Sequence, residues 1–166
     1  MPEVFVSIGS NIDRKRSISA GIEALWQRFG ILRLSSIYET EAVGFDGEPF
    51  YNLIAAFRSD EPPGEINQFF KQVEQAQGRD PKGQKFAPRT LDIDLILYGD
   101  MIGNEDNLQL PRDEIDRYAF VLEPLAELEP DRRYPGRDER FGEMWREAVA
   151  SGKMAPAIKV DWMPGT

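Results

Sequence analysis

The stretch that decides the fold of this chain leads from a basic turn into a short apolar strand that carries two aspartates. It reads Lys85-Phe86-Ala87-Pro88-Arg89-Thr90-Leu91-Asp92-Ile93-Asp94-Leu95-Ile96. Strand side chains alternate between two faces, so we expect Asp92 and Asp94 to share one face while the leucines and isoleucine around them share the other. Their Cα atoms would then lie roughly 6–7 Å apart, which suits a shared pair of hard, oxygen-seeking cations.

Basic residues gather just before this acidic pair, at Arg79, Lys82, Lys85 and Arg89. The chain as a whole is acidic, so this local concentration of cations indicates an anion site and not general solubility. Arginine binds phosphate oxygens in pairs through its planar fork, and lysine acts as a point charge. An isolated Asp-x-Asp pair is more often a solvated strand face, and the basic neighbourhood is what favours a metal and triphosphate site.

The composition limits the chemistry that this site can perform. The chain has no cysteine and no histidine, which excludes zinc–thiolate sites, thiol nucleophiles and every mechanism that depends on a Ser-His or Cys-His pair. Any metal must be held by oxygen atoms, a donor set that favours Mg²⁺, Mn²⁺ or Ca²⁺.

Length and charge bound the class of protein. The 166 residues fit one domain over 1–166, with an irregular tail from about residue 151. There is no apolar run near 18 residues in length and no basic-then-apolar leader, so we expect a soluble, cytoplasmic protein without a membrane partner. The net charge of −9, from 29 acidic and 20 basic residues, is opposite in sign to that of a nucleic-acid-binding surface.

Hydrophobic periodicity predicts an alternation of strands and helices along the first hundred residues. The expected order is strand, helix, strand, strand, helix, strand: Val4–Ile8, 16–29, 31–38, 50–58, a helix opened by Pro62-Pro63 and ended by Gly78, and 90–98. This βαββαβ order predicts an α/β (α+β) fold of the ferredoxin-like sandwich type.

The remainder of the chain is less regular. We expect a short edge strand at Leu108–Leu110, a helix over Tyr118–Leu128 and an extra C-terminal helix at Phe141–Ala150. Residues Ile158–Trp162 are apolar enough to pair with a sheet edge. The fold class is thus a ferredoxin-like sandwich with an added C-terminal helix and edge strands.

Gly9-Ser10-Asn11, at the end of the first strand, invites a nucleotidyltransferase interpretation, because that class pairs Gly-Ser with Asp-x-Asp. In this chain the two motifs lie some 80 residues apart, far more than the few residues of a hairpin loop, which disfavours it. A P-loop is excluded because Gly-Lys-Ser/Thr is absent. A turn and helix cap accounts for at least half of the role of this tripeptide.

Two phenylalanines and an asparagine are candidates for a ligand pocket. Phe50 and Phe120 are of a type more often found in cores than in ligand platforms. Asn52 lies two strand positions from Phe50 and therefore points to the same face. A buried amide needs hydrogen-bond partners, and a heteroaromatic ring with mixed donors and acceptors would supply them.

These segments together resemble the 6-hydroxymethyl-7,8-dihydropterin pyrophosphokinase family of folate biosynthesis. The resemblance covers the chain from Gly9-Ser10-Asn11 to Phe120-Val121-Leu122-Glu123-Pro124-Leu125. Its most specific part is the Lys85–Ile96 stretch. The segments Tyr38–Gly44 and Phe50-Tyr51-Asn52 resemble the pterin-binding segments of the family, and Glu74–Arg79 resembles the end of its second helix.

The resemblance implies an enzyme, a monomer that binds ATP and a pterin and transfers pyrophosphate to the pterin hydroxymethyl group. Asp92 and Asp94 would hold two Mg²⁺ ions, and Arg79 and Arg89 would support transfer from a mobile loop over about 80–89. It implies nucleotide contacts by Glu74, Arg79, Lys82, Lys85, Arg89 and Arg112. It implies pterin contacts by Thr40, Val43, Phe50, Asn52 and Phe120. Such a transfer depends on positioning and charge neutralisation, which a histidine-free chain can supply.

The chain departs from the family pattern at several positions around the expected site. Arg112 replaces a usual histidine, Tyr118 and Pro81 replace usual arginines, and Phe86 and Ala42 replace a tryptophan and a proline. Each lost charge-assisted contact would cost about 1.5–3 kcal/mol. The alternative to the enzyme is therefore a diverged paralogue that binds a pterin-like ligand or a nucleotide with weak or no turnover, and a weaker third is a regulatory small-molecule module.

Overall fold

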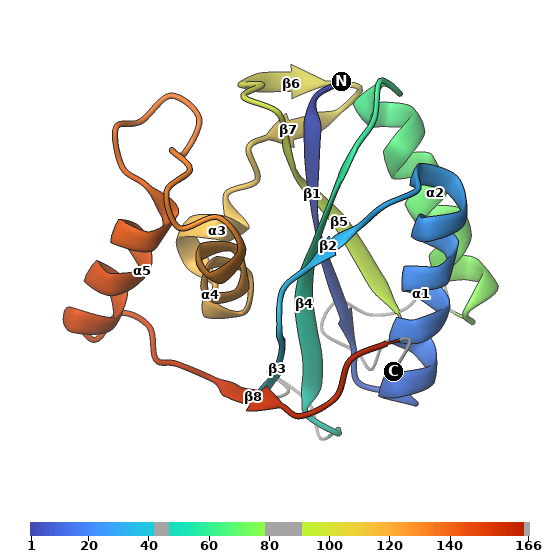
Figure 1. The fold of residues 1–166 in the computed structure, drawn as a ribbon, viewed down its shortest axis with the longest axis horizontal. Coiled ribbons are helices and arrows are strands. Elements are labelled where there is room, and N and C mark those ends of the chain that lie inside the picture. Colours follow the sequence, from blue (N-terminus) through green and yellow to red (C-terminus); the bar gives the residue numbers. More distant parts are fainter. Residues whose placement is uncertain (42–46, 79–90, 165–166) are drawn as a thin grey trace.

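The computed structural model describes residues 1–41, 47–78 and 91–164, and its centre is an antiparallel sheet with helices on both faces (Figure 1). The strands lie in the order β5-β1-β4-β3-β8, and the short β2 pairs with β4 along the same edge as β3. Their bounds are β1 Glu3–Ser10, β2 Arg33–Leu34, β3 Ile37–Thr40, β4 Phe50–Arg58, β5 Asp92–Tyr98 and β8 Ile158–Val160.

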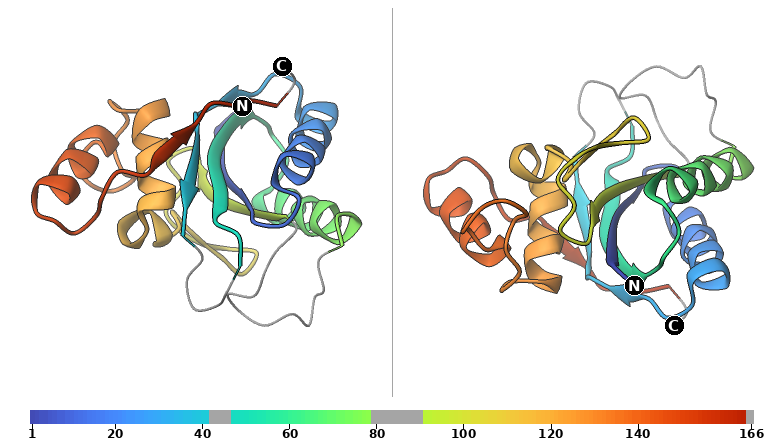
Figure 2. Two further views of the ribbon diagram at one scale, coloured as in Figure 1. Left: turned by 90° about the horizontal axis from the view of Figure 1, so that it is seen from below. Right: turned by 90° about the horizontal axis from the view of Figure 1, so that it is seen from above.

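The helices form layers on either side of this sheet (Figures 1 and 2). On one face lie α1 Arg14–Phe29 and α2 Pro63–Ala76. On the other lie α3 Glu114–Arg117 and α4 Ala119–Leu128, with α5 Phe141–Ala150 packed on the outer side of α4. The expected mixed α/β arrangement and the extra helix at Phe141–Ala150 are confirmed. No helix within the described ranges is long and apolar enough to cross a membrane.

Two hydrophobic cores follow from the alternation of side chains along the central strands. Val4, Val6 and Ile8 of β1 pack with α1 and α2, and Phe5 packs on the opposite face among residues of α4 and α5. Near the end of β1 the face that carries Phe5 is no longer apolar, because Ser7 and Gly9 are the next residues on that face. The second core therefore covers only part of its face and leaves one end of the sheet for other chemistry.

The strand expected over 31–38 is split into β2 and β3 by Ser35. The Ser35 N–H donates to the Ile54 carbonyl at 2.9 Å, and the Ser35 hydroxyl accepts the Ile54 N–H at 2.9 Å. The side chain thus takes the place of a backbone carbonyl, which breaks the ladder without leaving Ile54 unpaired.

Leu108–Leu110 forms strand β7 as expected, but it does not extend the main sheet, and that part of the prediction is wrong. It pairs instead with β6, Gly103–Glu105, in a separate two-stranded sheet. The turn residues Asp106 and Asn107 both have positive φ, 52° and 65°, which is the geometry of a tight hairpin. The outer edge of β5 is already occupied, by the Glu74 carboxylate at Ile93 and by the Arg112 N–H at the Ile96 carbonyl.

The C-terminal segment pairs with the sheet, as the apolar run at Ile158–Trp162 predicted. Strand β8 lies antiparallel to β3, with Tyr38 opposite Lys159. Just before it, the Ala157 N–H donates to a Glu123 carboxylate oxygen of α4 at 2.9 Å. Beyond it, Trp162 packs against the core of α1 and α2, so the segment joins both helical layers around one edge of the sheet (Figure 2).

Candidate active site

The candidate site lies at one end of the sheet, where β1 and β3 end and β4 and β5 begin (Figure 1). The register places four residues in one line across four strands, Tyr38, Asn52, Gly9 and Asp92. We call this line the cross-strand row. Residues directly opposite each other on antiparallel strands point to the same face, so the row brings Asn52 and Asp92, which lie 40 positions apart in the sequence, to either side of Gly9.

The two aspartates share one face of β5, as the alternation predicted. Leu91, Ile93 and Leu95 are buried in the core of α1 and α2, and Asp92 and Asp94 are partly buried on the opposite face. Asp94 lies opposite Ser7, and Asp92 lies opposite Gly9. The polar end of the second face therefore begins with this carboxylate pair.

The electrostatics of this pair favour the binding of a cation. Burial, followed by repulsion from Asp92, raises the pKa of Asp94 to about 7, although Lys71 and Arg112 act in the opposite direction. A divalent ion would remove the repulsion and stabilise both charges. The donor set is oxygen alone, which fits Mg²⁺. Within the described residues no cluster of three or more carboxylate, histidine or cysteine side chains completes a metal site, so phosphate and water oxygens would complete the coordination.

Glu74 of α2 holds the strand between the two aspartates. Its side chain is 1% exposed, and its Oε2 accepts the Ile93 N–H at 2.7 Å. Its Oε1 lies 3.4 Å from the Lys71 ammonium. The sequence indicated Glu74 only as a nucleotide contact through the family resemblance, and that assignment stays a prediction. The bond to Ile93 was missed because nothing in the local pattern shows which helix residue faces the edge of β5.

Three of the expected pterin residues come together on β3 and β4. Thr40 lies opposite Phe50, and Asn52 follows on the same face. Asn52 is 5% exposed and donates from Nδ2 to the Thr40 hydroxyl at 2.7 Å. This bond leaves the amide held in one orientation beside Gly9.

Gly9 allows a close approach of the Asn52 side chain at the centre of the cross-strand row. A Cβ atom at this position would lie 2.8 Å from the Asn52 Oδ1, a distance that real Cβ contacts essentially never show. The absence of a side chain at Gly9 therefore lets the Asn52 amide lie directly against β1. The sequence interpretation took this glycine as part of a turn and missed that role, which depends on the strand register.

Phe120 and Arg112 complete the part of the site that the structure describes. Phe120 lies in the first turn of α4 and packs against the core that contains Ile54, two positions from Asn52. Arg112, just before α3, forms an ion pair with Glu114 at 2.8 Å, and its charge favours the ionised form of Asp94. Five expected residues fall outside the described residues: Val43, Arg79, Lys82, Lys85 and Arg89. The expected mobile loop over about 80–89 lies there as well.

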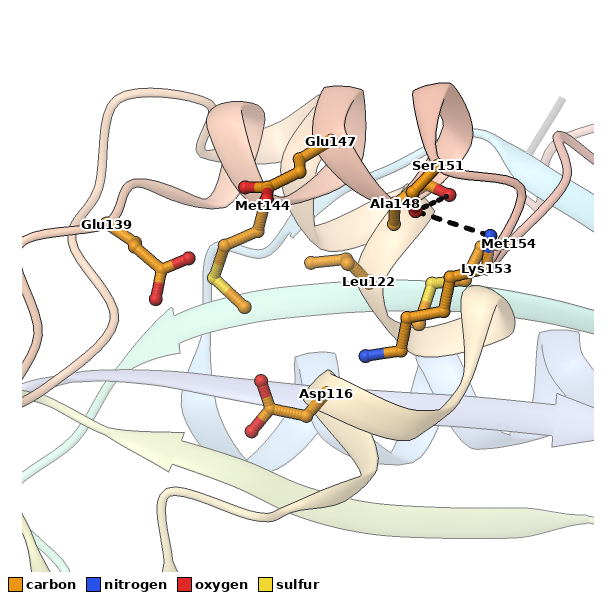
Figure 3. Close-up of a pocket in the computed structure, with 9 residues that line it drawn as sticks. All are labelled: Asp116, Leu122, Glu139, Met144, Glu147, Ala148, Ser151, Lys153 and Met154. Atoms are coloured by element: carbon orange, nitrogen blue, oxygen red, sulfur yellow. Dashed lines mark hydrogen bonds between the residues drawn. The ribbon is translucent and has the colours of Figure 1, made fainter.

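Two hollows open away from the cross-strand row. One, of ≈ 200 Å³, lies beside α5 and is lined by acidic, apolar and lysine side chains that include Asp116, Met144 and Lys153 (Figure 3). The other, of ≈ 350 Å³, lies at the start of α1, next to Arg14 and Tyr51. Neither is lined by the carboxylate pair or by Asn52, so neither contributes to the candidate site.

The chain is similar in sequence to known proteins of one family. Residues 5–130 match the family model described as 7,8-dihydro-6-hydroxymethylpterin-pyrophosphokinase (HPPK). A 2-amino-4-hydroxy-6-hydroxymethyldihydropteridine pyrophosphokinase of Aquifex aeolicus is 33% identical over 137 residues, covering 81% of this chain and 85% of the relative. The Pseudomonas aeruginosa protein of that name is 34% identical, covering 80% and 83%.

Solved structures show the same fold. A crystal structure of HPPK-DHPS in complex with substrates matches with a TM-score of 0.73 at 11% sequence identity, over 92% of this chain. A wild-type Plasmodium falciparum HPPK-DHPS matches with a TM-score of 0.70 at 12% identity. This chain spans 46% and 45% of these two solved chains, which are longer proteins.

Proposed function

The chain belongs to the 7,8-dihydro-6-hydroxymethylpterin pyrophosphokinase family, and on this premise we propose that the cross-strand row is its active site. The enzyme transfers pyrophosphate from ATP to the hydroxymethyl group of the pterin, a step of folate synthesis. One observation carries the assignment of the site. The register sets Asn52 and Asp92 about 10 Å apart, two strand spacings, on one face of the sheet and on either side of Gly9.

The pterin lies along this row, with its amino-pyrimidinone edge at Asn52 and its hydroxymethyl arm toward Asp92. Asn52 offers one acceptor and two donors, of which Thr40 takes one. Phe50 and Phe120 flank the ring from β4 and α4, and Thr40 and Val43 offer backbone groups to its edge.

The carboxylates of Asp92 and Asp94 hold the cations that accompany ATP, as two Mg²⁺ ions. When bound, these ions neutralise the triphosphate and polarise the pterin hydroxyl. The hydroxymethyl oxygen forms a bond to the β-phosphorus of ATP, the bond from that phosphorus to the α,β-bridging oxygen breaks so that AMP leaves with this oxygen, and the hydroxyl proton passes to solvent. Arg112 contributes positive charge beside Asp94. Glu74 contributes to the nucleotide site, and Arg79, Lys82, Lys85 and Arg89 bind and orient the phosphates.

Three further assignments accompany this function. We class the core as ferredoxin-like, supported by the β5-β1-β4-β3 order and the two helices on one face. We place the enzyme in the cytoplasm, as a monomer, where ATP and the pterin are its small-molecule partners. The departures at Tyr118 and Arg112 alter charges around the substrates and leave the carboxylate pair and Asn52 unchanged.

Asparagine substitution of each aspartate tests the site. Asp92→Asn and Asp94→Asn are expected to lower Mn²⁺ affinity, measured by electron paramagnetic resonance with α,β-methylene-ATP present, by at least about tenfold, since each removes one charged oxygen ligand. AMP release from Mg-ATP and the dihydropterin should fall in parallel. Asp138→Asn, an exposed carboxylate near α5, is the control and should leave both unchanged. Wild-type Mn²⁺ affinity in either aspartate variant would refute the metal assignment.

A further inference from the structure

Two stacked aromatic rings lie at the junction of α3 and α4, and one of them is the Phe120 ring assigned to the pterin site. The rings of Tyr118 and Phe120 are stacked, with centroids 4.9 Å apart and an interplanar angle of 20°. The Arg117 guanidinium lies 5.1 Å from the centroid of the Tyr118 ring. Both rings are partly exposed, so this stack is no part of the closed core, although it packs against it.

The backbone of Tyr118 is held at a fixed place in this stack. Its N–H donates to the Glu114 carbonyl at 2.9 Å, which closes α3. Its own carbonyl accepts the N–H groups of Val121 and Leu122 at 3.1 Å, which opens α4. Tyr118 therefore joins the two helices, and its ring starts from an anchored Cα atom two residues before Phe120.

The Arg117 cation next to the Tyr118 ring is held in place as well. The Arg117 guanidinium lies 3.3 Å from an Asp113 carboxylate oxygen and 3.4 Å from a Glu114 oxygen. A cation against the face of an aromatic ring attracts it electrostatically. Tyr118 thus contacts both a cation that is held in place and the Phe120 ring assigned to the substrate.

We propose that Tyr118 is a positioning residue for pterin binding, which backs the Phe120 ring so that the pterin stacks on the opposite face of Phe120. This inference rests on the proposed function of Phe120 as a wall of the pterin site. Phe120 lies in the first turn of a helix and is only partly buried, so a second ring against it restricts its motion before the substrate arrives. Preorganisation of this kind lowers the entropy lost on binding.

The proposal gives Tyr118 a use at a position where the family usually has an arginine. An aromatic side chain cannot contact a phosphate as a cation does, and the stack shows what it contacts instead. The residue would thus act on the pterin and not on the nucleotide. A purely electrostatic role of residue 118 would instead change the affinity for the nucleotide.

Substitution of Tyr118 tests the proposal by separating the affinities for the two substrates. Tyr118→Ala is expected to raise the pterin dissociation constant by about two- to tenfold, the range of one aromatic pair. The dissociation constant of α,β-methylene-ATP should change by less than about twofold. In steady state KM for the pterin rises while kcat is largely kept. Titrations follow the intrinsic fluorescence of 6-hydroxymethylpterin, and melting curves accompany each variant.

Two further variants keep the test independent of folding. Tyr118→Phe keeps the ring and loses the hydroxyl, so it should restore pterin affinity to within about twofold of the wild type. Trp26→Ala removes an exposed aromatic side chain of α1, away from the α3–α4 junction, and should change neither affinity. If Tyr118→Ala melts early, Tyr118→Leu supplies the same comparison with more of the volume retained.

The other outcomes overturn the proposal. Tighter pterin binding by Tyr118→Ala would mean that Tyr118 occupies the pterin position as a plug. Equal losses for pterin and nucleotide would mean a general effect on the fold. If Phe120→Ala loses pterin affinity and Tyr118→Ala does not, only this inference fails. If neither loses it, the proposed pterin site fails with it.

Discussion

Asp94 has a strongly perturbed carboxyl, and its protonation links stability to pH in the metal-free enzyme. Its pKa is raised to about 7 by burial and by Asp92, so the folded protein binds this proton more tightly than the unfolded chain does. The stabilising contribution is complete below the unfolded pKa, near 4, and is lost as pH rises to about 7.

We therefore expect Asp94→Asn to stabilise the metal-free protein at pH 8 by on the order of 2 kcal/mol, and by much less at pH 5. Urea unfolding at both pH values in the presence of a chelator measures this difference. Saturating Mg²⁺ with an ATP analogue should reverse the order, because only the wild type then binds the ions with both carboxylates. A stability difference independent of pH would contradict the raised pKa.

At the scale of single residues, the sequence predicts which face of a strand a side chain occupies better than it predicts what surrounds that side chain. The two-residue period of a strand was enough to place Asp92 and Asp94 on one face. The pKa of Asp94 depends on Lys71, Arg112 and the burial of that face, which come from separate segments of the chain. The role of Gly9 likewise depends on Asn52 as its cross-strand neighbour, and no local pattern shows that.

Among the elements, β5 is an edge strand, and the Glu74 side chain of α2 accepts a hydrogen bond from its outer edge. Glu74→Ala would leave the Ile93 N–H without its acceptor, and we expect a loss of about 1–3 kcal/mol of stability. We also expect weaker Mn²⁺ binding, because the strand between Asp92 and Asp94 would no longer be held. Glu74→Gln keeps an acceptor and should lose less. Denaturant unfolding and Mn²⁺ titration measure both effects.

Glu65→Ala, at an exposed position of the same helix, is the control for Glu74→Ala. Equal stability of these two variants would show that the Ile93 bond contributes nothing.

The bounds of α5 and β4 were predicted fully, since strong periodicity and clear end signals mark both. The break at Ser35 and the separate β6–β7 hairpin were not, since each depends on which backbone groups already have partners.

On the scale of the whole molecule, the C-terminal segment ties three layers together. It pairs with β3 through β8, bonds to Glu123 of α4 and packs Trp162 against the core of α1 and α2. Removal of residues 156–166 should cost about 1–3 kcal/mol, or a Tm lower by about 2–10 °C. It would also expose the edge of β3, and exposed edges favour association between chains.

Calorimetry and analytical ultracentrifugation of the truncated protein check both effects. Lys159→Ala in the chain without truncation keeps β8 and serves as the control. An unchanged Tm after truncation would contradict a structural role for the segment.

The sequence predicted that this region meets a sheet edge, but it did not show which edge, because strand order is a property of the assembled sheet.

The cross-strand row has a consequence for how the sheet is aligned. A shift of one residue in β4 or β5 would move Asn52 or Asp92 to the opposite face of the sheet. The two substrates can therefore engage only one alignment of these strands, and their binding stabilises it by mass action. Binding of ATP and the pterin therefore selects the correct strand register, through the same residues that hold the reactants.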